Sequence, residues 1–185
     1  MNARFLLEET PLSGVCLMQR IIIDDSRGSF SRLFCHEVFQ QFGFSKSIAQ
    51  INTSYTARRG TVRGLHFQHA PHQETKLVTC LIGEIYDVVV DVRQDSPTFL
   101  NWYGVILSRE NGKSLLIPEG FAHGFQAMTD NVDIVYIVSA PFAPESEGGL
   151  HYADPRLEIR WPLAVTDISE KDYQRPFLSQ NFKGI

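Results

Sequence analysis

Residues 61–92 read TVRGLHFQHAPHQETKLVTCLIGEIYDVVVDV and contain three apolar segments separated by short polar turns. These segments, 61–67, 76–82 and 84–92, have the length and the β-branched content of strands. Similar segments occur on both sides of this stretch, with Gly, Pro and Asn-Gly breaks between them, at 47–55, 102–107, 114–118, 121–128 and 132–138. Many short strands with such turns are typical of a sandwich or a barrel, so we expect an all-β fold.

Two local patterns refine this expectation. In 36–42 (HEVFQQF), the side chains of Val38, Phe39 and Phe42 share a helical face, and Gly43 follows as a C-cap, so a short peripheral helix is expected there. The Glu-Asn-Gly sequence at 110–112 suits a hairpin turn between the two flanking strands.

The composition is that of an ordinary globular protein. With 185 residues and no evident linker, we expect one domain over 1–185. A net charge of -4 gives no indication of a nucleic acid or an anionic membrane as partner. Three cysteines without CxxC spacing argue against a disulfide framework, and we find neither a signal peptide nor a membrane span. We therefore expect a cytoplasmic protein.

Alternation along the strands places polar groups beside apolar ones on faces that should lie inside the molecule. In 84–92, Asp87 and Asp91 share a face with valine and isoleucine side chains. In 49–54, Gln50 and Asn52 lie together with Ser54. Because buried polar groups need partners, a barrel with a ligand cavity explains this pattern better than a solid core.

Two residues near this cavity suggest acid–base chemistry. His66 offers a general base, and Lys76 offers a cation that could stabilise an enolate. Taken singly, such residues are more often structural. Likewise, His123 could be a core histidine, Tyr136 a core tyrosine, and Asp172 the cap of a terminal helix.

A metal site is a second possibility for the same region. Imidazole and carboxylate groups at His66, His69, His72 and Glu74 are the ligand types that metal-binding barrels use. A strand, however, would point His66 and His69 to opposite faces, and 69–72 has the composition of a loop. The non-metal interpretation is therefore favoured.

An ordered set of motifs extends from about residue 10 to 178. The blocks are 25–30 (DSRGSF), 50–52 (QIN), 63–68 (RGLHFQ), 76–78 (KLV), 83–88 (GEIYDV), 91–93 (DVR), 96–99 (SPTF), 107–108 (LS), 117–125 (IPEGFAHGF), 154–155 (DP), 161–162 (WP) and 169–172 (SEKD). Each block alone is weak, but the ordered set is highly specific. It resembles the dTDP-4-dehydrorhamnose 3,5-epimerase family.

The resemblance implies a cupin-like jelly-roll β-barrel with a few short peripheral helices. It also implies a homodimer that binds a nucleotide-diphosphate sugar in the barrel and uses no metal or organic cofactor. The activity implied is epimerisation at C3 and C5 of an NDP-4-keto-6-deoxyhexose, dTDP-4-dehydro-6-deoxy-D-glucose to dTDP-4-dehydro-L-rhamnose. The alternatives are an epimerase that inverts one carbon of another nucleotide sugar, a non-catalytic sugar-nucleotide-binding cupin, and a metal-dependent cupin oxygenase or isomerase.

The same resemblance assigns roles to individual residues. His66 would be the general base, Asp172 its carboxylate partner and Tyr136 the general acid on the opposite face of the sugar. Lys76 would supply positive charge where the enolate oxygen develops. The remaining positions implied to contact substrate are Arg27, Gln50, Asn52, Arg63, His123, Glu147 and Lys171.

Elementary chemistry agrees with these roles. A ketone at C4 acidifies the hydrogens on C3 and C5, because each carbanion delocalises into an enolate. Inversion then needs a base on one side of the ring and an acid on the other. No redox step is required, which is consistent with the lack of a GxGxxG fingerprint in the sequence.

Strict alternation places Arg63 and His66 on opposite faces of one strand, whereas the resemblance places both in one site. Either a bulge at Gly64 re-aims the strand, or Arg63 reaches the site from a rim or from a dimer partner. The chain also departs from the usual family pattern at four positions, which are Arg32, Ile137, Phe142 and Tyr152.

Overall fold

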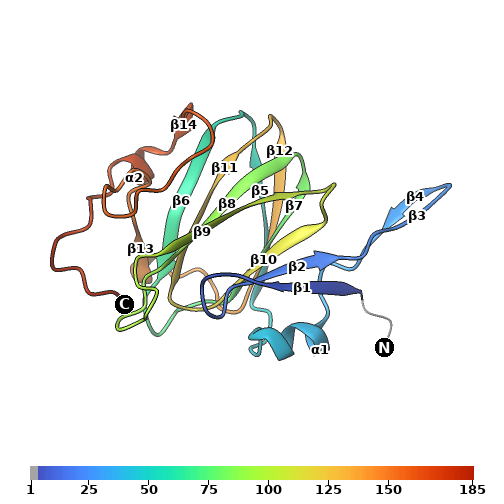
Figure 1. Ribbon diagram of the computed structural model, residues 1–185, viewed down its shortest axis with the longest axis horizontal. Coiled ribbons are helices and arrows are strands. Elements are labelled where there is room, and N and C mark those ends of the chain that lie inside the picture. Colours follow the sequence, from blue (N-terminus) through green and yellow to red (C-terminus); the bar gives the residue numbers. More distant parts are fainter. Residues whose placement is uncertain (1–3) are drawn as a thin grey trace.

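Two antiparallel sheets face each other in the computed structural model, which describes residues 4–185 (Figure 1). The first sheet has the order β1-β2-β10-β7-β12-β5, and the second has the order β13-β6-β11-β8-β9, with β14 parallel to β6. The first sheet consists of β1 (Phe5–Glu9), β2 (Cys16–Arg20), β10 (Lys113–Ile117), β7 (Lys76–Ile82), β12 (Val132–Val138) and β5 (Gln50–Thr56). The second consists of β13 (Glu147–Gly149), β6 (Thr61–Gln68), β11 (Phe121–Ala127), β8 (Glu84–Asp91), β9 (Trp102–Ser108) and β14 (Asp167–Ile168).

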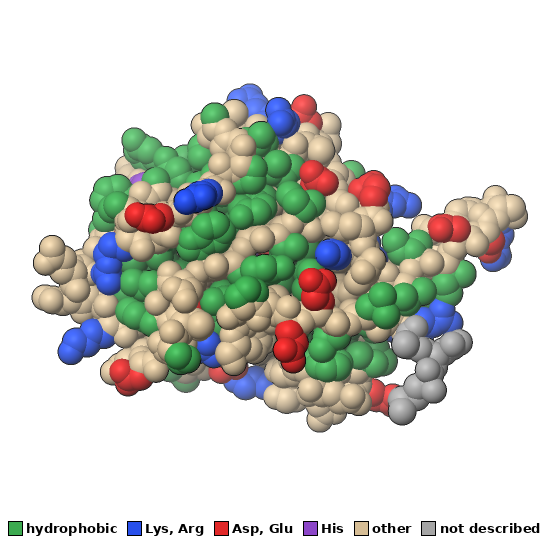
Figure 2. Space-filling model, in the orientation of Figure 1, with side chains coloured by type: hydrophobic (Ala, Val, Ile, Leu, Met, Phe, Trp, Pro, Cys, Tyr) green, Lys and Arg blue, Asp and Glu red, His purple; other side chains and the backbone are tan. Residues whose placement is uncertain are grey.

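The remaining elements are short and peripheral. A hairpin of β3 (Ile23–Asp25) and β4 (Gly28–Phe30) stands away from the two main sheets, as Figures 1 and 2 show. The helical segments are α1 (His36–Phe39), η1 (Gln40–Phe42), η2 (Pro144–Ser146) and α2 (Glu170–Tyr173). The expected all-β class with a few short helices is confirmed. No helix within residues 4–185 is long and apolar enough to cross a membrane.

The apolar residues form three clusters that follow from strand alternation. The first lies between the sheets and includes Val89 and Phe125. Val88 and Val90 point to the opposite face of β8, where the second cluster packs with aromatic residues of the C-terminal segment. The third cluster covers part of the first sheet through Phe39 of α1. Both faces of β8 are therefore buried, as the run of valines indicates.

The expected helix at 36–42 is present as α1 followed by η1, and Gly43 ends it in the left-handed conformation with φ 103°. The expected hairpin at 110–112 is wrong. β9 belongs to the second sheet and β10 to the first, so this turn carries the chain from one sheet to the other. Asn111 still closes the turn, because its Oδ1 accepts hydrogen bonds from the backbone amides of Ser108 (3.1 Å) and Lys113 (2.8 Å).

Candidate active site

A cavity of about 280 Å³ opens between the two sheets. Residues of β5, β7 and β12 line it from the first sheet, and residues of β6, β11 and β13 line it from the second. A second hollow, of about 480 Å³, shares Arg63, His66, Tyr136 and Glu147 with the first. Every predicted site residue except Arg27 lines one of these two spaces. The predicted constellation is therefore assembled in three dimensions, apart from one arginine.

His66 and Asp172 form a close pair although they are 106 residues apart in sequence. The His66 Nε2 atom lies 2.6 Å from Asp172 Oδ1, and the backbone amide of Gly64 donates to Asp172 Oδ2 at 3.3 Å. Burial raises the pKa of the Asp172 carboxyl, but the hydrogen bond and charge of His66 outweigh this effect and lower the pKa to about 2. An ionised carboxylate thus faces the imidazole. Such a partner orients a histidine that acts as a general base and stabilises the imidazolium that forms.

The helix at 170–173 explains how Asp172 reaches His66. Ser169 is the N-cap, and its Oγ accepts a hydrogen bond from the Asp172 backbone amide at 3.1 Å. Because Ser169 caps the helix, the Asp172 side chain is free to point at the imidazole. The alternative that Asp172 itself caps a terminal helix is therefore wrong.

A bulge in β6 brings Arg63 and His66 to the same side. In the pairing of β11 with β6, His123 lies opposite His66 while Phe125 lies opposite Arg63, so the register shifts by one residue between them. Gly64 occupies the bulge with φ 116°. Both side chains then line the cavity within one chain, and the bulge alternative is confirmed.

Tyr136 faces the cavity from β12 in the first sheet, whereas His66 faces it from β6 in the second. Burial raises the pKa of the Tyr136 phenol, and the negative charge of Asp87 raises it further. The phenol is therefore protonated at neutral pH and can act as a proton donor. Its ring lies edge-on to that of His123, with 6.2 Å between centroids.

Lys76 and His123 each have a carboxylate partner that the sequence analysis did not assign. Lys76 Nζ lies 3.0 Å from Glu74 Oε1, and Nζ is 6.0 Å from the centre of the Tyr136 ring. His123 Nε2 lies 2.7 Å from the fully buried Asp87 Oδ1. A carboxylate within a run of valines was the available signal for Asp87, since buried charges need partners.

Glu147 forms the edge of the site on β13. Its carboxylate bonds to Lys171, and its Oε1 accepts a hydrogen bond from Arg175 Nη2 at 2.9 Å. Burial raises the pKa of Glu147, but the hydrogen bond and charge of Lys171 outweigh this and lower it. The Lys171 side chain is 64 % exposed, whereas that of Arg175 is 13 % exposed. Arg175 was not predicted.

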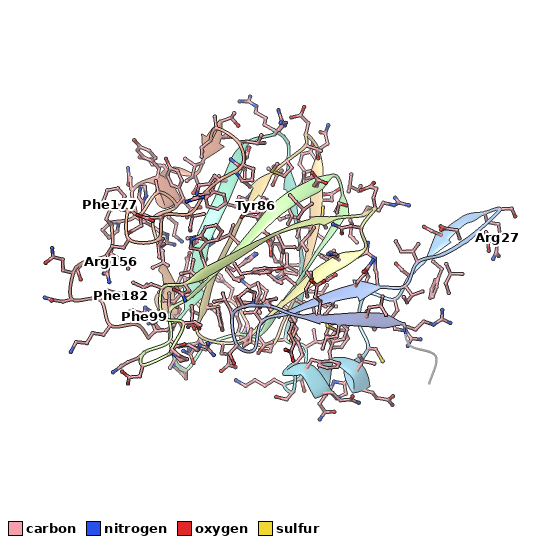
Figure 3. All side chains as sticks on the ribbon, viewed as in Figure 1. Arg27, Tyr86, Phe99, Arg156, Phe177 and Phe182 are labelled. Atoms are coloured by element: carbon pink, nitrogen blue, oxygen red, sulfur yellow. The ribbon has the colours of Figure 1, made fainter. Side chains whose placement is uncertain are left out.

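The structure does not bring Arg27 to the cavity. This residue lies at the end of the β3–β4 hairpin, which extends away from the sheets (Figures 1 and 3). Its side chain is 87 % exposed and pairs with Asp25 at 2.6 Å. A motif identifies a residue type and a place in the chain, but it does not reveal that the hairpin carrying it projects outward.

The four departures from the family pattern occupy different environments. Ile137 points away from the cavity into the cluster with Phe39, and Arg32 is exposed and does not line the cavity. Phe142 is exposed at the cavity rim, where its backbone amide donates to Gln50 Oε1 at 3.0 Å. Tyr152 stacks on the ring of His151. Only Phe142 of the four therefore lies on the cavity.

The alternative metal site depends on a cluster of ligands around His66. Over residues 4–185, no group of three or more His, Cys, Asp or Glu side chains is arranged to hold a metal ion. His69, which this alternative needs, packs edge-on against Phe67 and does not line the cavity.

Known proteins with similar sequences share one description. The family model for dTDP-4-dehydrorhamnose 3,5-epimerase matches residues 9–180. The enzyme of that name from Sinorhizobium fredii is 44% identical over 157 residues, covering 84% of this chain and 80% of that protein. The one from Salmonella typhimurium is 37% identical over 174 residues, covering 93% and 94%.

Solved structures give the same result. The Bacillus anthracis dTDP-4-dehydrorhamnose 3,5-epimerase with TDP and PPi bound has a TM-score of 0.90 and 39% identity, covering 94% of this chain and 99% of that one. The Legionella pneumophila enzyme in complex with dTDP-4-keto-L-rhamnose has a TM-score of 0.87 and 39% identity, covering 91% and 89%. A 3′-monoepimerase from Streptomyces bikiniensis has a TM-score of 0.84 and 33% identity, covering 91% and 87%. This chain belongs to the dTDP-4-dehydrorhamnose 3,5-epimerase family.

Proposed function

We propose that this chain inverts C3 and C5 of dTDP-4-dehydro-6-deoxy-D-glucose to give dTDP-4-dehydro-L-rhamnose, a step of dTDP-rhamnose biosynthesis, without a metal or an organic cofactor. One observation carries the proposal. An imidazole with a buried carboxylate and a protonated phenol line the same cavity from opposite sheets. A base and an acid on opposite sides of a sugar ring are what inversion next to a ketone requires.

The reaction begins with His66, which removes the proton from the carbon next to the C4 carbonyl. The electron pair of the C–H bond moves into the C4 carbonyl and forms an enolate. The ammonium group of Lys76 stabilises the negative oxygen, and Asp172 stabilises the imidazolium.

Inversion is completed when Tyr136 donates its proton to the opposite face of the same carbon. The enolate electrons return to form the new C–H bond, and the carbonyl is restored. The imidazolium then releases its proton to solvent and the phenolate takes one up. Because C3 and C5 both flank the carbonyl, one base and one acid can serve both carbons.

The charged rim suits a nucleotide diphosphate. Arg63 lies between the two hollows, with Nε donating to Thr56 Oγ1 (3.0 Å) and Nη2 donating to the Tyr55 carbonyl (2.9 Å). The planar guanidinium keeps donors free for phosphate oxygens. The exposed ammonium of Lys171 adds charge at the second hollow. Gln50 and Asn52 supply hydrogen-bonding groups from β5.

A single-carbon epimerase acting on another nucleotide sugar is the second candidate. Phe142 on the cavity rim departs from the family pattern, and a 3′-monoepimerase has the same fold. The two candidates share the acid and the base, so the difference depends on how the sugar is seated.

Deuterium incorporation distinguishes the candidates. The enzyme is incubated with dTDP-4-dehydro-6-deoxy-D-glucose in D₂O, and the sugar is analysed by NMR. We expect deuterium at both C3 and C5. Deuterium at one carbon favours the second candidate, and binding without exchange indicates a non-catalytic protein.

Full activity after chelation is also expected. A transition metal that is present in stoichiometric amount and is needed for activity contradicts the cofactor-free mechanism.

We also propose a homodimer in which Arg27 reaches the substrate of the partner copy. Arg27 lies on a projecting hairpin and is 87 % exposed, so a substrate contact requires a second chain. Inactive Arg27→Ala and His66→Ala proteins are mixed under conditions that allow subunit exchange. Heterodimers then contain one intact site, so activity should return to about a quarter of the wild-type value. Mixtures that stay inactive after verified exchange contradict the contribution in trans.

The protein is proposed to act in the cytoplasm. Cys16, Cys35 and Cys80 are all free thiols. A reducing compartment keeps thiols in this state.

A further inference from the structure

Arg175 lies next to Asp172, the carboxylate partner of the predicted general base. It follows α2, and its side chain is 13 % exposed. A Cβ atom at Gly149 would collide with the Arg175 guanidinium, and Gly149 is the residue of β13 that pairs with His66 of β6. The guanidinium therefore fills the space that a side chain at 149 would take, beside the strand position of His66. Arg175 does not line either hollow of the site.

From this position, Arg175 reaches two carboxylates on different elements. Its Nη2 donates to Glu147 Oε1 on β13 at 2.9 Å. Its Nε lies 3.6 Å from Asp172 Oδ1 on α2, the same oxygen that contacts His66. This Nε is buried and has no hydrogen-bond partner within residues 4–185. A buried donor without a hydrogen-bond partner of its own thus lies next to the carboxylate that contacts the proposed base.

We propose that Arg175 is a positioning residue that holds Asp172 against His66 and tunes how readily the imidazole takes up a proton. This inference rests on the proposed function, in which His66 is the base. It adds a residue that acts through the Asp172 carboxylate and does not touch the sugar.

Four charged side chains set the balance of charge around His66. Asp172 and Glu147 carry negative charge, and Arg175 and Lys171 carry positive charge. Lys171 is mostly exposed, so water and salt screen it, whereas Arg175 is mostly buried. Without Arg175, the two carboxylates favour the imidazolium, which cannot accept a proton from carbon. The other charged or titratable groups that line the hollows with His66 are Arg63, Glu74, Lys76, His123, Tyr136 and Asp167.

The test is the pH dependence of kcat/KM for the wild type and three variants. Arg175→Gln removes the charge, Arg175→Lys keeps it, and Arg160→Gln makes the same charge change at an exposed residue. For Arg175→Gln, we expect the acid limb to move up by about one pH unit and kcat at pH 6 to fall about tenfold, with KM nearly unchanged. Arg175→Lys should restore the wild-type limb, and Arg160→Gln should not move it.

An acid limb of Arg175→Gln that coincides with the wild-type limb overturns the inference, as does an equal shift in Arg175→Lys. Circular dichroism verifies folding. If Arg175→Gln does not fold, Gly149→Ala is used, because its Cβ displaces the Arg175 guanidinium. This variant should also move the limb to higher pH, and an unmoved limb overturns the inference. If the wild type shows no exchange in D₂O, the proposed function itself fails. A normal wild type with unmoved limbs refutes only the role of Arg175.

Discussion

At the scale of single residues, the two histidine–aspartate pairs of His66 and His123 differ in their exposure. Each imidazole contacts an aspartate within 2.7 Å. The His123 side chain is 6 % exposed and Asp87 is fully buried, whereas the His66 side chain is 37 % exposed toward the cavity. A base must meet its substrate, so accessibility favours His66 over His123 as the proposed base.

Replacing the proposed base should greatly slow exchange. For His66→Ala, we expect the rate of deuterium incorporation at both carbons to fall by ~10²–10⁴-fold, because the proposed base is removed. His69→Ala is the matched control, since His69 is exposed and outside the cavity. NMR of the sugar in D₂O measures both variants. Exchange retained in His66→Ala means that the base is another residue.

Removing the phenol should separate deprotonation from inversion. In Tyr136→Phe, His66 still takes the proton, but no acid returns one on the opposite face. We therefore expect slow inversion with some residual exchange, measured by comparing product formation with deuterium uptake. Tyr103→Phe, which removes a hydroxyl from a tyrosine outside the cavity, is the control. Normal inversion in Tyr136→Phe is evidence against the acid role.

At the scale of elements, the bulge in β6 determines where two functional side chains point. Without it, the two-residue period of a strand would send Arg63 and His66 to opposite faces. Gly64 makes the bulge possible, because a Cβ atom there would lie 2.6 Å from Gly124 Cα and 2.8 Å from the His123 carbonyl oxygen. Both are backbone atoms of the neighbouring strand, so they cannot move aside easily.

Gly64→Ala should therefore destabilise the protein and disturb the site together. We expect a loss of roughly 2–4 kcal/mol in the free energy of unfolding, measured by urea denaturation, from the strained φ and the clash with β11. Gly43→Ala is the control, since Gly43 also has positive φ but nothing lies within 4 Å of the added Cβ. It should cost about 1 kcal/mol. Equal losses in both variants argue against the close packing at the bulge.

At the scale of the whole molecule, the two sheets carry the proposed acid and base on opposite sides of the cavity. The second sheet carries His66 and the first carries Tyr136 and Lys76, so the cavity between them is also the place where base, acid and cation meet. The same packing buries the carboxylates of Asp91 and Asp172. Of these two ionised groups, Asp91 belongs to the fold alone, whereas Asp172 is also the proposed partner of the base.

These carboxylates predict the acid stability of the fold. Burial raises the pKa of Asp91, but hydrogen bonds from Arg93, Ser96 and Thr98 lower it to about 2, and Asp172 also titrates at about 2. Because both values lie below the ordinary ~3.9, the stabilisation is complete above about pH 4 and is lost as the pH falls toward 2.

Asp91→Asn should remove roughly 2 kcal/mol at neutral pH and flatten the decline in stability between pH 4 and 2. Urea denaturation across this range measures both effects. Asp95→Asn serves as the control, because Asp95 is exposed and is not among the residues that bond to Asp91. A decline in Asp91→Asn as steep as in the wild type contradicts this account.

The sequence alone determined the central strands, the polar and apolar alternation of β8, and the family. Period-two alternation and turn residues act locally, so they can be read without a fold, and an ordered set of motifs identifies a family with no coordinates. The polar set at Gln50 and Asn52 likewise indicated a cavity.

The tertiary structure decided what depends on pairing across the chain. It selected the bulge for Arg63, sent the turn at Asn111 between the sheets, placed Arg27 outside the cavity, and put Arg175 between Glu147 and Asp172. Each outcome depends on which strands become neighbours. That choice is made by burial and hydrogen bonding over the whole molecule, which no local pattern contains.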